Sequence, residues 1–296
     1  MKYIYLLALV LLLFSNCKND TRNENINEIE ESDEFKSSDQ DKIQKVDRDI
    51  KLFDKTISIE LKQKKLIDKK DESEELQKLL IDKKYVVKNK NYSINFKYPL
   101  LNESFKPSNA NFNDFINNYY VNITKTESDI IESKLQCDSI ESKTFREERF
   151  INYKIYNVND RLVSVLFYKE NFYSGAMHPS YSFDCFNFDL NRGVFMTYED
   201  FFIKGSEDDL LIIINEKISK KIQKGDLYYE CWELSSTDFF EGKNNFVLND
   251  TYLEFYFDDC VMCPSYTGTY SIELPLTDLL PVLKKYDMNP LGFLVK

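Results

Sequence analysis

The sequence predicts an α+β fold with a mainly antiparallel sheet and about three packed helices, preceded by a charged, partly helical N-terminal tether. Three observations support this class. Strand-like runs alternate between apolar and polar residues, without the regular strand–helix alternation of parallel α/β proteins. Other runs have the apolar spacing of three and four residues that is typical of amphipathic helices. The aromatic content of 15% supplies enough apolar surface for a folded core.

Net charge and histidine content argue against several functions. The 296 residues carry a formal charge of −11, whereas nonspecific nucleic-acid binding requires a cationic surface. A single histidine must serve every imidazole role, which disfavours two-histidine metal sites and protease-type triads. We therefore expect no nucleic-acid partner, no metal and no cofactor.

Residues 1–16 form a predicted signal peptide. Lys2 precedes an apolar run from Tyr3 to Phe14, which is shorter than the about 20 residues of a spanning helix. Cys17 follows, so the segment resembles a bacterial lipoprotein signal in which this cysteine receives the lipid, palmitate for example. We expect an exported protein anchored in a membrane of the bacterial cell envelope, periplasmic or surface-exposed. The alternative is an ordinary cleaved signal or an uncleaved anchor.

Residues 17–84 form a predicted charged tether. Between Lys18 and Lys84, 35 of 67 residues are charged and none is Gly or Pro, so this segment cannot build a core by itself. Five apolar residues line one face of a predicted helix: Ile43, Val46, Ile50, Phe53 and Ile57. Because they extend over only about two heptads, a short stalk or a docked helix is favoured over a dimerising coiled coil.

The composition changes at Tyr85, where we predict a small companion subdomain over residues 85–140. Residues 85–87 and 92–98 have strand character, and Pro99 ends the second run. Residues 109–136 then have helical apolar spacing.

Residues 141–296 are predicted to form a C-terminal domain. Its strand candidates are residues 145–156, 162–173, 181–190, 194–197, 246–248, 252–257 and 269–274. A helix is expected from Ser206 to about residue 223, because acids lie in its first turn, lysines lie near its end, and Gly225 follows. A closing helix is expected over residues 277–286.

Five cysteines remain if Cys17 carries a lipid: Cys137, Cys185, Cys231, Cys260 and Cys263. An odd number leaves at least one thiol free or intermolecular if the others pair. Cys260 and Cys263 have the spacing of a redox motif or a zinc half-site, but no second CxxC or histidine cluster accompanies them. Structural or unpaired cysteines are therefore favoured over redox chemistry and metal binding.

Five short motifs occur in a fixed order in the C-terminal half. They are Ser174–Pro179, Phe186–Gly193, Met196–Phe202, Pro264–Gly268 and Ile272–Leu279. In this order they resemble the extracytoplasmic domain of the RsiV-type anti-sigma-V factor, which recurs in polysaccharide deacetylases and in lipoproteins of unknown function. The residues that match this family pattern are Gly175, Ala176, His178, Pro179, Asp189, Gly193, Asp200, Pro264 and Gly268.

The resemblance implies a binding role. In the best understood member this domain binds lysozyme, a strongly basic protein, and makes the anchored protein a sensor. From Tyr85 onwards the chain has 31 acids against 22 bases. This net negative charge is complementary to the positive charge of lysozyme. The segments that resemble the family include neither the sigma-binding region nor a deacetylase domain, so signal transduction and deacetylation are not expected.

We therefore expect a lipid-anchored envelope protein of binding or sensor type, favoured over an enzyme, whose ligand is a lysozyme-like protein or peptidoglycan. The candidate ligand-binding residues are His178, Tyr173, Tyr181 and Tyr266. A structural role for the His178 ring is favoured over ligand contact and catalysis, and Trp232 is expected to be a packing anchor. The alternatives are an envelope hydrolase that uses His178 with a nearby carboxylate, and a purely structural lipoprotein. No oligomeric state is predicted.

Overall fold

Six strands form the larger of two sheets, in the order β1-β2-β3-β4-β5-β6. The computed structural model describes residues 78–139 and 145–284, so the predicted signal, Cys17 and most of the tether lie outside the described residues. The strands are β1 (Leu80–Lys88), β2 (Tyr92–Leu101), β3 (Glu147–Val158), β4 (Leu162–Phe172), β5 (Ser180–Asp189) and β6 (Val194–Met196). All neighbouring strands are antiparallel except β2 and β3. The predicted class and the mainly antiparallel sheet are confirmed.

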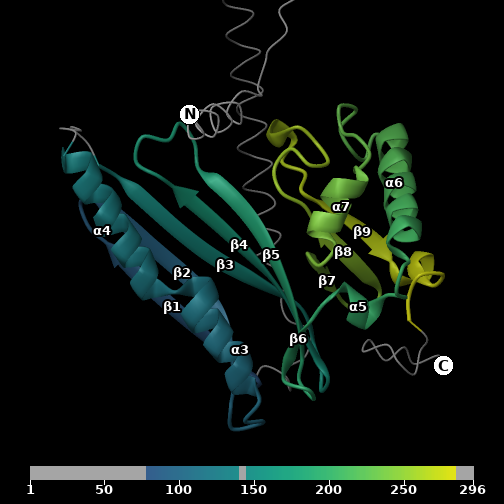
Figure 1. Cartoon of the computed structure of the whole chain (residues 1–296), viewed down its shortest axis with the longest axis horizontal. Coiled ribbons are helices and arrows are strands. Elements are labelled where there is room, and N and C mark those ends of the chain that lie inside the picture. The colour runs from purple at the N-terminus through teal and green to yellow at the C-terminus, as the bar shows by residue number, and fades with distance from the viewer. Residues whose placement is uncertain (1–77, 140–144, 285–296) are drawn as a thin grey trace, which may run out of the picture. The chain divides into compact units, whose positions relative to one another are not determined.

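The parallel pair β2–β3 is joined by helices, because a parallel connection must cross over the sheet. A single helix was predicted over residues 109–136, but three consecutive parts are found: α3 (Asn109–Phe115), the π-helix η2 (Ile116–Val121) and α4 (Ile123–Ser139). Asn122 separates the last two with a left-handed backbone, φ 33°, which asparagine tolerates better than most residues. Figure 1 shows α3 and α4 in front of β1 and β2.

The second sheet contains β7 (Phe246–Leu248), β8 (Tyr252–Tyr256) and β9 (Ser271–Pro275), all antiparallel. The helices around it are α5 (Tyr198–Phe201), α6 (Glu207–Lys224) and α7 (Ser236–Gly242), with the 3-10 turns η3 (Ser265–Thr267) and η4 (Leu276–Leu279). Figure 1 places α6 and α7 in front of β8 and β9. Instead of the expected closing helix, the described residues have only η4, and Pro281, which has no backbone N–H to continue a helical hydrogen-bond ladder, follows soon after it.

The large sheet is covered differently on its two faces. On its helix face, Phe112 and Ile116 pack against Phe167 in one buried cluster. On its small-sheet face, Leu166 and Phe183 pack against residues of β7 and β8. The first seven residues of β4 are buried, because this strand is covered on both faces. That explains why its sequence is a continuous apolar run rather than an alternating one.

Polar contacts also join the two sheets. The Asn187 side chain donates a hydrogen bond of 2.9 Å to the Phe246 carbonyl. The backbone N–H of Leu248 donates to the hydroxyl of Ser164 at 3.0 Å. These side chains satisfy backbone groups that would otherwise be buried without partners. In the described part of the chain, no helix is long and apolar enough to cross a membrane.

Candidate functional site

The loop between β4 and β5 holds the first family motif. Gly175 has a φ of 85°, which glycine adopts without strain, and the Ala176 N–H closes a turn on the Tyr173 carbonyl at 3.0 Å. The His178 side chain is exposed, and its Nδ1 lies 3.2 Å from the Pro179 carbonyl oxygen. Within residues 78–139 and 145–284, no carboxylate is hydrogen-bonded to this ring. The loop therefore lacks the orienting carboxylate that a histidine general base uses.

Two of the four candidate ligand-binding residues, Tyr173 and Tyr181, lie on opposite faces of the large sheet. Tyr173 is 48% exposed and lies on the helix face, with the Arg149 guanidinium 4.2 Å from its ring centre. Tyr181 is half-buried on the small-sheet face, where its ring stacks on Tyr168 at 6.2 Å. Tyr266 is in η3, far along the chain from both. The sequence could not reveal this separation, because the two faces of β4 and β5 are distinguished only by strand register.

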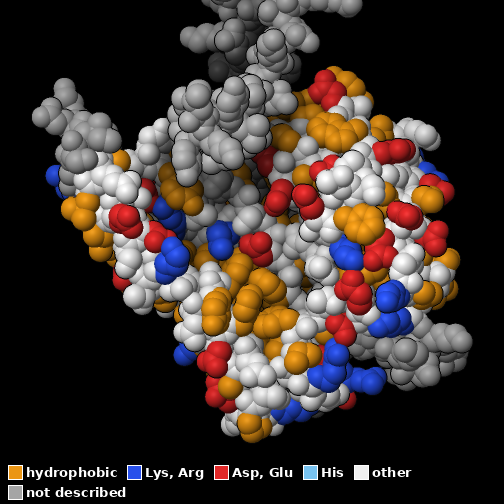
Figure 2. All heavy atoms as spheres, viewed as in Figure 1, with side chains coloured by type: hydrophobic (Ala, Val, Ile, Leu, Met, Phe, Trp, Pro, Cys, Tyr) orange, Lys and Arg blue, Asp and Glu red, His pale blue; other side chains and the backbone are white. Residues whose placement is uncertain are grey.

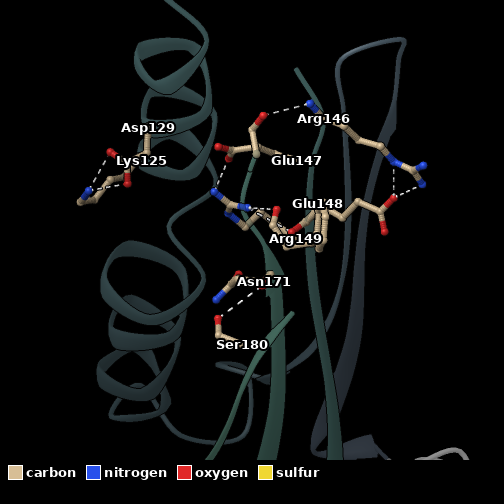
Figure 3. Close-up of polar contacts among 10 residues, drawn as sticks. Lys125, Asp129, Arg146, Glu147, Glu148, Arg149, Asn171 and Ser180 are labelled. Carbon is tan, nitrogen blue, oxygen red and sulfur yellow. Dashed lines mark hydrogen bonds and ion pairs between the residues drawn. The ribbon is translucent and has the colours of Figure 1, made fainter. Parts of the chain in front are cut away.

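A buried ion pair supports the sheet next to Tyr173. Arg149 pairs with Glu147, and their side chains are 8% and 3% exposed. Arg149 also donates hydrogen bonds to the carbonyls of Glu148 at 3.1 Å and Phe172 at 3.0 Å. Figure 3 shows this guanidinium beside the ends of the strands. Because its donors have partners in the protein, Arg149 fastens β3 to the end of β4 and gives the Tyr173 ring a fixed support.

Two loops beside the small sheet, residues 225–235 and 257–268, form a second surface, which we name the aromatic loops. A disulfide between Cys231 and Cys263 joins them, and the Trp232 N–H donates to the Met262 carbonyl at 3.0 Å. Four aromatic side chains are exposed here: Tyr228 by 41%, Tyr229 by 72%, Trp232 by 42% and Tyr266 by 42%. The ring centres of Tyr228 lie 4.6 Å from Tyr229 and 5.7 Å from Tyr266.

Charge on the aromatic loops has a single sign. Five exposed acids lie in them: Asp226, Glu230, Glu233, Asp258 and Asp259. Neither loop contains a Lys or an Arg. The surface therefore combines aromatic rings with carboxylates, two groups that attract cations.

Two sequence expectations concern residues of the aromatic loops. Trp232, expected as a packing anchor, exposes 42% of its surface, so its side chain is partly covered and also contributes to the outer face of the loop. Cys263 is bonded to Cys231 while Cys260 is exposed and unpaired, which agrees with the expectation of structural or unpaired cysteines. The density of aromatic and acidic residues in 225–235 is visible in the sequence and indicates the first of the two loops that form this surface. The disulfide that brings the second loop to it was not visible in the spacing of the cysteines.

Other family-motif residues shape turns. The Asp189 carboxylate accepts from the Arg192 Nε at 2.7 Å and from two backbone N–H groups, and Arg192 also pairs with Asp200 at 2.8 Å. Burial opposes ionisation of Asp189, but these hydrogen bonds outweigh it and lower its pKa. Gly193 has a φ of 67°, and a Cβ there would lie 2.6 Å from the Ser108 Cβ. Pro264 and Gly268 flank η3, the turn that carries Tyr266.

The fold and its surfaces define an α+β domain with two disulfide-linked loops that expose aromatic side chains. Residues 199–277, which include both aromatic loops, match the family model described as "Protein of unknown function (DUF3298)".

One curated relative is an enzyme. Over 150 residues the chain is 29% identical to the peptidoglycan-N-acetylmuramic acid deacetylase PdaC of Bacillus subtilis (strain 168). The match covers 49% of this chain but only 31% of that enzyme. The chain thus spans less than a third of the relative's length.

Two solved structures are similar. A DUF3298 family member from Bacteroides fragilis NCTC 9343 has a TM-score of 0.52 at 14% identity, over 70% of this chain and 94% of that one. A DUF3298 family protein from Pseudomonas aeruginosa PAO1 has a TM-score of 0.49 at 12% identity, over 70% and 93% of the two chains. The first comparison shows a shared fold.

Proposed function

We propose that this chain is a lipid-anchored binding protein of the bacterial cell envelope, whose aromatic loops hold a cationic protein of the lysozyme type. The observation that carries the proposal is the surface of the aromatic loops, which has four exposed rings, five exposed acids and no base. Lysine and arginine side chains of a partner would be attracted by the ring faces and by the carboxylates. The resemblance to the RsiV-type domain and the lipoprotein-like segment ending at Cys17 support the same proposal.

The disulfide gives the proposed surface its rigidity. Cys231 and Cys263 are both buried, and their bond keeps Tyr228 in contact with Tyr266 across the two loops. A surface held in its binding shape loses less conformational entropy when a partner docks. In this proposal residues 1–16 are the signal, and the tether runs from residue 17 only to the start of β1 at Leu80, because residues 80–84 of the expected tether (17–84) pair with β2. The tether presents the companion subdomain (85–140) and the C-terminal domain (141–296) to the ligand.

A cell-wall glycan is the second candidate ligand. It is favoured by the likeness to a relative whose name states that it acts on peptidoglycan, and aromatic rings with a polar edge suit the faces of sugars. We do not propose hydrolysis, because the described residues place no orienting carboxylate at His178.

Binding measurements separate these candidates. The full chain, solubilised in detergent, is titrated with lysozyme and with solubilised peptidoglycan at about 50 and about 300 mM NaCl. A cationic ligand predicts lysozyme binding that weakens strongly as salt rises. A glycan held on the rings of the aromatic loops predicts peptidoglycan binding that changes little with salt. Absence of lysozyme binding at the lower salt concentration would contradict the first candidate, and absence of both would favour a purely structural lipoprotein.

A further inference from the structure

A polar cluster on the helix face of the large sheet contains a cation without a hydrogen-bond or ion-pair partner among the described residues. We name Lys169, Tyr120, Ser182 and Asp184 the sheet-face cluster. The Tyr120 hydroxyl donates to the Asp184 Oδ2 at 2.7 Å, and the Ser182 hydroxyl donates to the same oxygen at 3.1 Å. The Lys169 ammonium lies 4.2 Å from the centre of the Tyr120 ring. Tyr120 belongs to the π-helix η2, a conformation that occurs frequently at functional sites.

The Lys169 ammonium has three donors, and no hydrogen bond or ion pair joins it to any residue in 78–139 or 145–284. Burial lowers its pKa, while the charge of Asp184 acts in the opposite direction. A half-buried cation with unfilled donors gains when an anionic acceptor supplies them. The Asp184 Oδ1, in turn, accepts no hydrogen bond from a described residue, so it is available to hydroxyl donors.

Neighbouring side chains extend the cluster along β4 and β5. The strand register places Lys169 opposite Ser182, and Asn171 opposite Ser180. Figure 3 shows Asn171 and Ser180 near Arg149, whose guanidinium supports the exposed ring of Tyr173. In Figure 2 basic and acidic side chains lie close together on the viewed face, between α4 and the small sheet. The row thus offers an ammonium, a carboxylate, amide and hydroxyl groups, and an aromatic ring.

We propose that this row binds an acidic oligosaccharide. Its carboxylate would pair with Lys169, its hydroxyls would bond to Asp184 and Asn171, and a further sugar ring would lie against Tyr173. Lys169 lies in β4 and Tyr173 directly follows the last residue of that strand, so the two are separated by about 13 Å if the chain stays extended at roughly 3.3 Å per residue. This length requires more than one sugar ring. The site is independent of the cationic-protein ligand proposed above, because it lies on different elements from the aromatic loops.

Calorimetric titration of the full chain in detergent tests the site. The probes are a tetrasaccharide of alternating N-acetylglucosamine and N-acetylmuramic acid with free carboxylates, and chitotetraose, which has the same length and no charge. We expect the charged probe to bind about tenfold or more tightly than the neutral one. Equal affinity for both probes, or no binding of the charged one, overturns the proposal.

Variants assign the effect to Lys169. Lys169→Met should remove the preference for the charged probe, whereas Lys169→Arg should retain most of it. The control is Lys204→Met, at an exposed lysine outside the sheet, which should leave the preference unchanged. Tyr173→Ser should weaken the binding of both probes. Lysozyme binding measured on the same Lys169→Met sample should be unchanged, which checks folding and separates this site from the aromatic loops. An unaltered preference in Lys169→Met contradicts the assignment.

Discussion

Cys231 and Cys263 are bonded across 32 residues of sequence, and their disulfide holds two exposed aromatic loops against each other. Neither loop has regular strand pairing of its own. The covalent bond and the Trp232–Met262 hydrogen bond therefore fix the relative position of Tyr228 and Tyr266. A binding surface that lacks secondary structure depends on such a constraint to keep its shape.

Removing this disulfide should destabilise the domain. For a loop of this size, Cys231→Ser with Cys263→Ser is expected to cost about 3 kcal/mol of the free energy of unfolding, measured by urea denaturation. Cys260→Ser is the matched control, because Cys260 is exposed and unpaired, and it should have little effect. Equal losses in the two proteins would contradict a disulfide between Cys231 and Cys263.

The buried ion pair of Arg149 and Glu147 should be sensitive to loss of one partner. Arg149→Met leaves a buried carboxylate without its cation and should cost about 3–5 kcal/mol. Arg146 provides the control, because its pair with Glu148 is 74% and 44% exposed. Arg146→Met should change stability by less than about 1 kcal/mol. Similar urea midpoints for the two variants would contradict a larger contribution of the buried ion pair to the free energy of unfolding.

Gly193 should be the least replaceable of the glycines with positive φ. Alanine there is strained by the backbone and also approaches Ser108 at 2.6 Å, so Gly193→Ala should cost well over 1 kcal/mol. Gly205→Ala is the control, because it has a φ of 83° and open space around the added Cβ. The difference between the unfolding free energies of the two alanine variants measures the cost of the contact with Ser108. A difference near zero would mean that Ser108 moves away freely.

Acid should weaken the contact between α6 and the residues around Lys243. Hydrogen bonds from Lys243 lower the pKa of Glu199 and of Glu207 below the ordinary value of 4.5. A carboxyl whose pKa is lower in the folded state stabilises the fold above its unfolded pKa, and this contribution is lost as pH falls through the folded pKa. Lys243→Met should therefore reduce the loss of stability below about pH 4.5. Denaturation curves at pH 7 and pH 3 measure this difference, and an unchanged pH dependence would contradict it.

Most of the strands and the helix α6 are predictable because each depends on local signals. Two strand bounds are wrong: residues 80–84 belong to β1 and not to the tether, and β2 continues past Pro99 to Leu101. The α6 helix begins with Glu207, Asp208 and Asp209 and ends at Gly225, which has the left-handed backbone of a terminating glycine. The Gly193 turn and the hairpin at Asn249 follow equally from nearby residues. In these segments the residues that determine the structure are neighbours in the sequence.

The candidate surfaces depended on long-range contacts. Tyr173 and Tyr181 are close in sequence, but Tyr173 stacks on Arg149 on the helix face and Tyr181 stacks on Tyr168 on the small-sheet face. The sheet-face cluster escaped notice because Tyr120 reaches Asp184 only when η2 packs on the sheet. The match to the DUF3298 model supports the resemblance at the level of that domain.

The most direct test of the proposed function compares the lysozyme affinity of two tyrosine variants of the full chain. Tyr229 in the aromatic loops is 72% exposed, and Tyr119 in η2 is 77% exposed, so both are removed without loss of core packing. At about 50 mM NaCl, Tyr229→Ser should raise the Kd for lysozyme about tenfold, while Tyr119→Ser should leave it unchanged. Equal affinities for the two variants and the unaltered chain would contradict binding at the aromatic loops.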